Sequence, residues 1–382
     1  MSRNDSICDE LHRRGLLSSQ EVSEYKATLT SVASIPKPIH DHISSLLLQD
    51  IDATIENVRV QSNDLAATSL DTSNLAALAV GGALGALSAW MRPTATSTTV
   101  WANAYDGAVA TFNVAKRKRH LEQIQLQLLS GDIATCRHVV FCINGFMTQR
   151  DDPTRTWRVW TQEDTAIFAV QWEAGDATAW NEFCTHINDK FDSSSNLPAM
   201  LAHFAGNPWH NAQAKAEQVG VLLAHVLAER PALLQGRPIS LFGHSLGGAA
   251  VYSTFQELAK LRAQERETAV PLIANAVSFA GAFLSDAQGL LNISNGLDPK
   301  GGKFINVFSS RDGVLSKLFW ALHLPQSPIV AGCQSLTFTA ANCVNIEVSD
   351  LVIPRVETHF GHSYGQFMEM IKSRVLPHLF RS

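Results

Sequence analysis

Charge is scarce in this sequence and is not dominated by one sign. Asp, Glu, Lys and Arg together make up 17% of the 382 residues, and the formal net charge is -5. Domains that bind nucleic acid usually carry a clear basic excess. The composition therefore gives no support to a general role on nucleic acid.

Paired cysteines and a secretory leader are missing too. The six cysteines are scattered and form no CxxC pair, so we expect no disulfide framework, no metal site, no cofactor and a reducing compartment. The first ten residues contain no apolar stretch of the kind found in a signal peptide. We expect a cytoplasmic or peripherally membrane-associated protein, although export by a leaderless route would leave no such mark.

The most informative stretch is a short apolar run that ends in Gly243-His244-Ser245-Leu246-Gly247 and continues as a small-residue helical pattern. This is the G-x-S-x-G pattern of a nucleophile elbow, in the strand-turn-helix context that the motif requires. The two glycines lack a Cβ, so the strand and the helix can approach closely around the serine. The alternative is a purely structural turn. The context favours a serine hydrolase with Ser245 as its nucleophile.

Residues 1–135 are predicted to form a helical region. An apolar i,i+4 stripe after Pro38 indicates one amphipathic helix, with Ile43, Leu47, Ile51, Ile55 and Val58 on its buried face. Residues 74–91 form an uncharged, Ala- and Gly-rich segment at the lower length limit for a membrane span. Its Gly81 and Gly85 suit close helix packing. We favour a helix buried against the rest of the protein, with membrane insertion as the alternative.

A third helix is expected from about residue 100 to residue 129. It carries the basic run Lys116-Arg117-Lys118-Arg119-His120, which predicts a solvated face, with contact to anionic lipid headgroups as the alternative. Ser130-Gly131-Asp132 indicates the stop before the second domain, residues 136–382.

The second domain alternates apolar runs with helical patterns, which predicts a mostly parallel, doubly wound α/β sheet. Continuous apolar runs are typical of strands covered on both faces. We expect strands at 137–144, 165–172, 238–243, 272–279, 303–308 and 343–348, and a closing helix at 364–375.

The loop after the first of these strands contains Gly145-Phe146. In a fold with this elbow, such a loop supplies one backbone N–H of the oxyanion hole, and the residue after the nucleophile supplies the other. We therefore assign the hole to the N–H groups of Phe146 and Leu246, with a simple turn at Gly145 as the alternative. Residues 173–209 are less regular, and either a lid or two packed helices would fit them.

A serine nucleophile needs a base, and the base needs a carboxylate to orient it. The expected chain order is Ser, then Asp or Glu, then His. Asp312 follows the 303–308 strand and is the expected acid, with Asp286 as the main rival and helix capping as the non-catalytic alternative. His359 and His362 both follow the last strand, and we favour His362.

Several stretches taken in order resemble the transmembrane-and-coiled-coil-domain hydrolase-like family. They include Arg237 to Gly248, the helix after Asn207-Pro208-Trp209, Ile305 to Leu315, Asn144-Gly145-Phe146 and Gly361-His362-Ser363-Tyr364. The resemblance covers about residues 137–375. It implies an α/β-hydrolase fold, a catalytic triad at Ser245, Asp312 and His362, and lipase- or esterase-like activity, often with membrane association.

The sequence thus predicts a serine esterase that acts on a carboxylic ester, plausibly a lipid, through an acyl-enzyme. Gly145, His244, Trp320 and Phe360 are the residues expected to line the substrate site. The alternative is a hydrolase-like scaffold whose apolar segment mediates membrane or protein association. The oligomeric state does not follow from the sequence.

Overall fold

The computed structural model describes residues 3–31, 35–66, 120–175, 208–264, 270–319, 330–338, 340–353, 362 and 364–379. Its centre is a sheet with the strand order β1-β3-β2-β4-β5-β6-β7. The strands are β1 Ile124–Ser130, β2 His138–Ile143, β3 Thr165–Trp172, β4 Ile239–His244, β5 Asn275–Phe279, β6 Lys303–Phe308 and β7 Cys343–Glu347. Only β1 pairs antiparallel with its neighbour; the other pairs are parallel.

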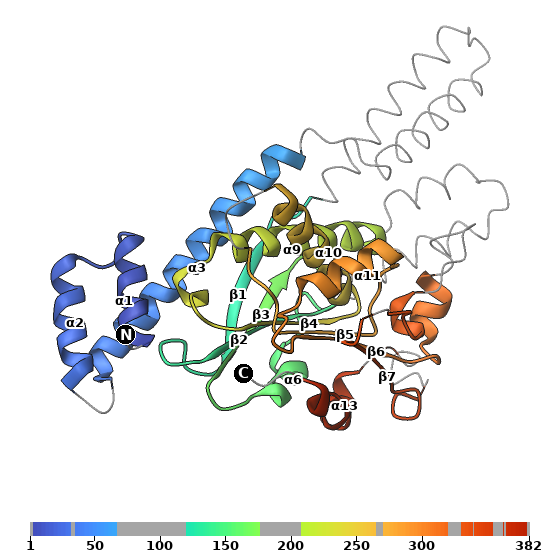
Figure 1. The fold of residues 1–382 in the computed structure, drawn as a ribbon. Coiled ribbons are helices and arrows are strands. Elements are labelled where there is room, and N and C mark those ends of the chain that lie inside the picture. Colours follow the sequence, from blue (N-terminus) through green and yellow to red (C-terminus); the bar gives the residue numbers. More distant parts are fainter. Residues whose placement is uncertain are drawn as a thin grey trace, which may run out of the picture.

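Helices cover both faces of this sheet. Figure 1 shows α9 (Pro208–Glu229), α10 (Leu246–Gln264) and α11 (Ala287–Gly296) on one face, with α6 (Thr154–Trp157) and α13 (Met368–Val375) on the other. Single turns complete the connections: η1 Arg158–Trp160, η2 Ala232–Leu234, η3 Val314–Phe319, η4 Ala331–Cys333, η6 Gly365–Phe367 and η7 Leu376–His378. The central strands are accordingly apolar on both sides, and every residue of β5 is buried. The predicted mostly parallel, doubly wound α/β sheet is confirmed.

The parallel strands end at one edge of the sheet, and this edge carries the predicted site residues. Gly145 follows β2, Ser245 follows β4, Asp312 follows β6, and His362 comes after β7. In open α/β sheets, ligands bind beyond the carboxyl ends of the strands. The topology therefore collects residues that lie far apart in the sequence.

The first strand corrects one expectation. The helix predicted for residues 100–129 is wrong over Ile124–Ser130, which forms β1 and pairs with β3. The sequence there, IQLQLLS, alternates apolar and polar side chains over its first five residues, as a half-exposed edge strand does. The residues of the basic run before His120 lie outside the described residues, as do residues 74–91. The predicted domain division at residue 135 remains a prediction.

Within the described ranges, three helices precede the sheet: α1 (Arg3–Arg13), α2 (Ser19–Ser31) and α3 (Lys37–Ala66). The predicted amphipathic stripe of α3 is confirmed, since all five of its apolar members are buried. Helix α3 packs against α9, η2 and β1. Figure 1 shows α1 and α2 at one side of the domain, connected to it by α3.

A partly buried ion pair joins the end of α1 and helix α3 to the turn after α9. The Arg14 guanidinium pairs with Asp50 at 3.1 Å and also donates to the backbone carbonyls of Glu229 and Arg230. The other carboxylate oxygen of Asp50 accepts from the N–H of Ala232 at 2.6 Å.

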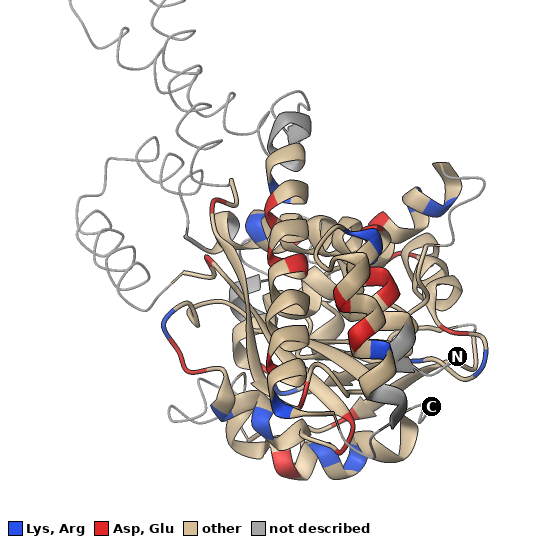
Figure 2. Cartoon of the chain, turned by 90° about the vertical axis from the view of Figure 1, so that its left-hand side faces the viewer, with Lys and Arg blue, Asp and Glu red and all other residues tan. Residues whose placement is uncertain are grey.

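Charges of both signs share the surface around these helices. Figure 2 shows acidic and basic residues interspersed along α3 and the neighbouring elements, and two i,i+3 or i,i+4 pairs on α3, Arg59 with Glu56 and Lys37 with Asp41, account for part of this pattern. None of the helices in the described ranges has both the length and the apolar character that crossing a membrane requires.

Candidate active site

Ser245 sits on a sharp turn between β4 and α10. Its φ angle is +57°, a left-handed conformation that costs a non-glycine residue about 1–3 kcal/mol. Backbone hydrogen bonds hold the turn: the N–H of Ser245 donates to Phe279 O at 2.9 Å, and the N–H of Ala282 donates to Ser245 O at 3.0 Å. The neighbouring strand β5 and the residues after it therefore stabilise the elbow.

Two glycines make this turn possible. A Cβ on Gly243 would lie 2.2 Å from the carbonyl oxygen of Gly247, and a Cβ on Gly247 would lie 2.0 Å from that of Ile143. No other residue fits at either position without moving the backbone. Strand β4, strand β2 and the first turn of α10 thus approach closely around the serine.

A chain of hydrogen bonds connects Ser245 to His362 and Asp312. His362 Nδ1 lies 2.7 Å from Asp312 Oδ2, and His362 Nε2 lies 2.8 Å from Ser245 Oγ. An ionised carboxylate only accepts hydrogen bonds, so the imidazole N–H at Nδ1 donates to Asp312. The other nitrogen, Nε2, then accepts from the serine hydroxyl. This is the geometry in which a histidine can remove the serine proton.

Asp312 has two roles in the structure. Its side chain is completely buried, and Oδ1 accepts from the N–H groups of Val314 and Leu315 at 3.0 and 2.9 Å. Oδ2 remains for His362. The capping alternative and the pairing with histidine are therefore both realised, one on each oxygen.

The aspartates that could take the place of Asp312 beside the histidine have different partners. Asp286 is the N-cap of α11 and accepts from the N–H of Gly289 at 2.6 Å. Asp350 pairs with Arg374 on the surface, and Asp298 accepts from the N–H of Lys300 in a turn. Among the described acidic side chains, Asp312 is the one that hydrogen-bonds to the His362 ring. His359, the alternative base, lies outside the described residues.

The loop after β2 lies directly against Ser245. A Cβ on Gly145 would be 2.5 Å from the Cβ of Ser245, so the backbone of this loop passes next to the nucleophile immediately before Phe146. Leu246 is the first residue of α10, and the N–H groups of a first helical turn have no partner within their helix. The positions of both predicted oxyanion donors are thus adjacent to the serine.

Sequence reasoning missed the residues that fix this loop. The indole N–H of Trp157 donates to Asn144 Oδ1 at 2.6 Å, and that of Trp172 donates to the carbonyl of Asn144 at 3.1 Å. Thr148 Oγ1 donates to the carbonyl of Gly145 at 2.6 Å. Tryptophans at a motif-bearing loop were visible in the sequence, but their targets depend on the tertiary fold.

Other predicted lining residues are partly placed. The His244 side chain points to His362, and its Nε2–H donates to the backbone carbonyl of that residue at 3.0 Å. The Phe146 ring packs edge-on against Trp209 at a centroid distance of 5.2 Å. Trp320, Phe360 and most of the 173–209 segment lie outside the described residues. Among the described side chains, no three His, Cys, Asp or Glu residues gather as metal ligands do.

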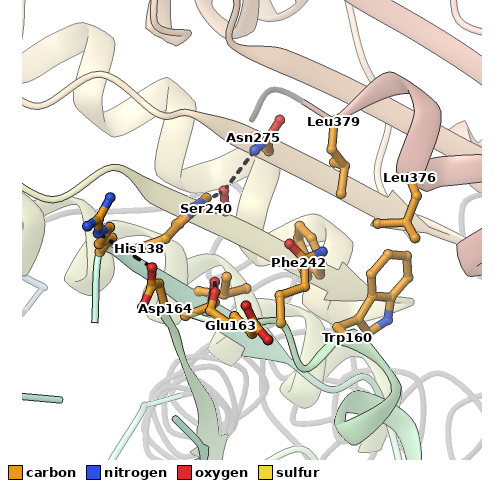
Figure 3. Close-up of a pocket in the computed structure, with 13 residues that line it drawn as sticks. His138, Trp160, Glu163, Asp164, Ser240, Phe242, Asn275, Leu376 and Leu379 are labelled. Carbon is orange, nitrogen blue, oxygen red and sulfur yellow. Dashed lines mark hydrogen bonds and ion pairs between the residues drawn. The ribbon is translucent and has the colours of Figure 1, made fainter. Parts of the chain in front are cut away.

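A separate cavity lies at the opposite edge of the sheet, where the strands begin. It has a volume of about 250 Å³, and its lining includes His138, Ser240 and Asn275. Figure 3 shows Ser240 between the other two: Asn275 Nδ2 donates to Ser240 Oγ at 3.3 Å, and His138 Nε2 lies 2.8 Å from the same oxygen. These polar groups bind one another, and none of them belongs to the Ser245 site.

The segment that carries these residues has relatives. Residues 194–374 match a family described as a protein of unknown function, DUF726. The matched segment contains Ser245, Asp312 and His362, so the hydrogen-bonded chain described above lies within it.

Curated relatives extend the match to other parts of the chain. The chain is 28% identical over 233 residues to the transmembrane and coiled-coil domain-containing protein STS1 of Oryza sativa subsp. japonica, which covers 55% of this chain and 33% of that protein. It is 24% identical over 240 residues to an uncharacterized membrane protein of Schizosaccharomyces pombe, covering 57% and 29%. It is 31% identical over 123 residues to the probable lipase MIL1 of Saccharomyces cerevisiae, covering 32% and 10%. The match thus spans a third or less of each relative.

Two solved structures can be superposed on part of this backbone. Esterase 2 of Thermogutta terrifontis is 12% identical, covers 68% of this chain and 92% of its own, and gives a TM-score of 0.32. A lipase-esterase related protein of Clostridium acetobutylicum is 11% identical, covers 67% and 99%, and gives a TM-score of 0.29.

Proposed function

We propose that this protein is a serine hydrolase that cleaves carboxylic esters through an acyl-enzyme. The observation that carries the proposal is the hydrogen-bonded chain from Ser245 through His362 to Asp312, at the carboxyl edge of the sheet. His362 removes the proton of Ser245 Oγ as that oxygen attacks the ester carbonyl. Asp312 keeps the imidazole in the required tautomer and stabilises the imidazolium that forms.

The proposed oxyanion hole consists of the N–H groups of Phe146 and Leu246. Charge develops on the carbonyl oxygen as the tetrahedral intermediate forms, and donors already aimed at this position lower the barrier. His362 then protonates the leaving alcohol. In the second half of the reaction it activates water, which releases the acid and restores Ser245.

For the substrate, we propose a lipid ester taken from or near a membrane surface. Two relatives are named as transmembrane or membrane proteins and one as a probable lipase. The partly exposed ring of Phe146, in the loop after β2, supplies apolar surface suited to an acyl chain.

Labelling with a fluorophosphonate probe tests the chemistry. Wild type should be labelled and Ser245→Ala should not, because the probe reacts with an activated serine. Ser240→Ala is the matched control: it also removes a serine hydroxyl bonded to a histidine, in this case Ser240 of β4 bonded to His138 of β2, and it should still be labelled. Labelling that survives Ser245→Ala would contradict the proposal.

Chain-length dependence tests the substrate class. p-Nitrophenyl esters of two to sixteen carbons and vesicles of phosphatidylcholine would be offered to the wild type and Ser245→Ala. A lipid-type enzyme should show a higher kcat/KM for long acyl chains and release fatty acid from the vesicles. Turnover of p-nitrophenyl acetate alone would contradict the proposal of a lipid substrate, although the proposal of an esterase would still stand.

A further inference from the structure

His244, the residue before the nucleophile, contacts the backbone of the candidate base rather than the serine. Its Nε2–H donates to the carbonyl oxygen of His362 at 3.0 Å. The two imidazole rings lie 5.3 Å apart, and the His244 ring lies 5.7 Å from that of Tyr364. Tyr364 is fully buried. His244 therefore connects the rigid end of β4 to the segment that bears the base.

This contact differs in kind from the other two that His362 makes. Ser245 and Asp312 bind the imidazole ring, and they can do so only while the backbone delivers the ring to them. The bond to Ser245 is also lost once Oγ carries an acyl group. During that half of the reaction, Asp312 and the backbone must keep His362 in place for the attacking water.

We propose that His244 is a positioning residue that fixes the backbone of His362 and thereby holds its imidazole between Ser245 and Asp312. This inference rests on the proposed serine-hydrolase function. It assigns His244 to the support of the base, in place of the substrate contact that the sequence suggested.

The protonation state of His244 fits this role. Burial, and then the charge of a protonated His362, lower its pKa to about 3, although the bond to the carbonyl acts in the opposite direction. His244 is thus a neutral donor at any pH at which the enzyme would work. A second positive charge 5.3 Å from His362 would oppose formation of the imidazolium, and a neutral ring avoids this.

Two substitutions separate the hydrogen bond from the ring. His244→Phe keeps an aromatic ring but lacks the donor, whereas the amide of His244→Gln can reach the carbonyl of His362. With p-nitrophenyl butyrate, His244→Phe should lower kcat roughly tenfold, since small displacements of a catalytic group have effects of this size. KM should change less than about twofold, and His244→Gln should recover most of the rate. If the Phe variant does not fold, His244→Met provides the same loss of donor.

A double-mutant cycle separates positioning from substrate contact. In a His362→Ala background there is no imidazole to position, so adding His244→Phe should lower the residual rate no further. An equal loss in both backgrounds would overturn the inference, as would a wild-type rate in His244→Phe. If the fluorophosphonate probe does not label Ser245 in the wild type, this would instead count against the proposed function.

A spectroscopic measurement keeps the inference testable without any substrate. The Nδ1–H of an imidazole bonded to a buried carboxylate gives a far-downfield proton resonance, and His362→Ala identifies it by its absence. This resonance should be present in the wild type and His244→Gln and be lost or broadened in His244→Phe. An unchanged resonance in His244→Phe would overturn the positioning role, whatever the activity.

Discussion

Three glycines make room for the close approach of the backbone around Ser245. A Cβ on Gly145, Gly243 or Gly247 would come within 2.5, 2.2 and 2.0 Å, respectively, of atoms in the elbow or in strand β2. Two of these contacts are with backbone carbonyl oxygens, which cannot move aside as the end of a flexible side chain can. A single methyl group at the elbow should therefore disturb both the fold and the nucleophile.

Gly247→Ala should lower the free energy of unfolding by about 1–3 kcal/mol, the usual cost of overpacking, and abolish labelling of Ser245. Urea denaturation and the fluorophosphonate probe measure the two effects. Gly365→Ala is the matched control, because its Cβ would meet only Thr156 Oγ1 at an ordinary 3.5 Å. Equal denaturation midpoints for the two variants would show that the elbow tolerates the methyl group.

Sequence reasoning reached Ser245 because the motif is local, and it reached Asp312 because the acid directly follows a recognisable strand. His362 required the chain order of the hydrolase fold. The bond from His244 to His362 was out of reach, since it joins residues 118 positions apart. Such contacts depend on where the sheet places two strand ends, which no local pattern encodes.

At the scale of elements, helix α6 and strand β3 hold the loop after β2 in place. Trp157 belongs to α6 and Trp172 to β3, and both donate to Asn144 at the start of the loop. Helix α6 and strand β3 therefore hold Asn144, two residues before Phe146, in place. We expect the oxyanion hole to depend on these tryptophans although neither is a catalytic residue.

Trp157→Phe should lower kcat roughly tenfold to a hundredfold with little change in KM, because a displaced donor stabilises the transition state less well. Trp160→Phe is the matched control. Trp160 is almost as buried as Trp157, but its indole N–H donates to no partner among the described residues. Steady-state kinetics on one p-nitrophenyl ester distinguish the two. Equal losses would mean that packing, not the bond to Asn144, matters.

The elements themselves were predictable to different degrees. Strands β3 and β6 and the stripe of α3 followed from continuous or periodic apolar patterns. Strand β1 was missed because an edge strand alternates, and its short alternation, Ile124 to Leu128, followed a stretch with helical character. Its partner β3 begins 35 residues after β1 ends, so pairing could not be inferred from neighbouring sequence.

At the scale of the whole molecule, two partly buried histidines at opposite edges of the sheet, His138 and His244, make the fold sensitive to acid. Burial lowers the pKa of His138 from 6.5 to about 4, and His244 behaves similarly. Below pH 6.5 the unfolded chain binds protons at these two histidines, whereas the folded chain does not. The contribution of the two histidines to the free energy of unfolding is thus fully present above pH 6.5 and falls as the pH approaches 4.

His138→Gln should reduce this dependence. Between pH 7 and pH 5 the wild type should lose about 2 kcal/mol more unfolding free energy than the variant, from the difference in bound protons. Urea denaturation at the two pH values measures the difference. His378→Gln removes an exposed histidine and should behave as the wild type does. The same loss in all three proteins would show that His138 titrates normally in the fold.

The bonds of Arg14 and Asp50 join the N-terminal helices α1 and α3 to the end of α9 and the turn at Ala232, and the apolar face of α3 on α9 reinforces them. These contacts do not depend on the backbone between Ala66 and His120. We expect a chain that is cut between these two residues to remain a single particle, with its two fragments eluting together under native conditions.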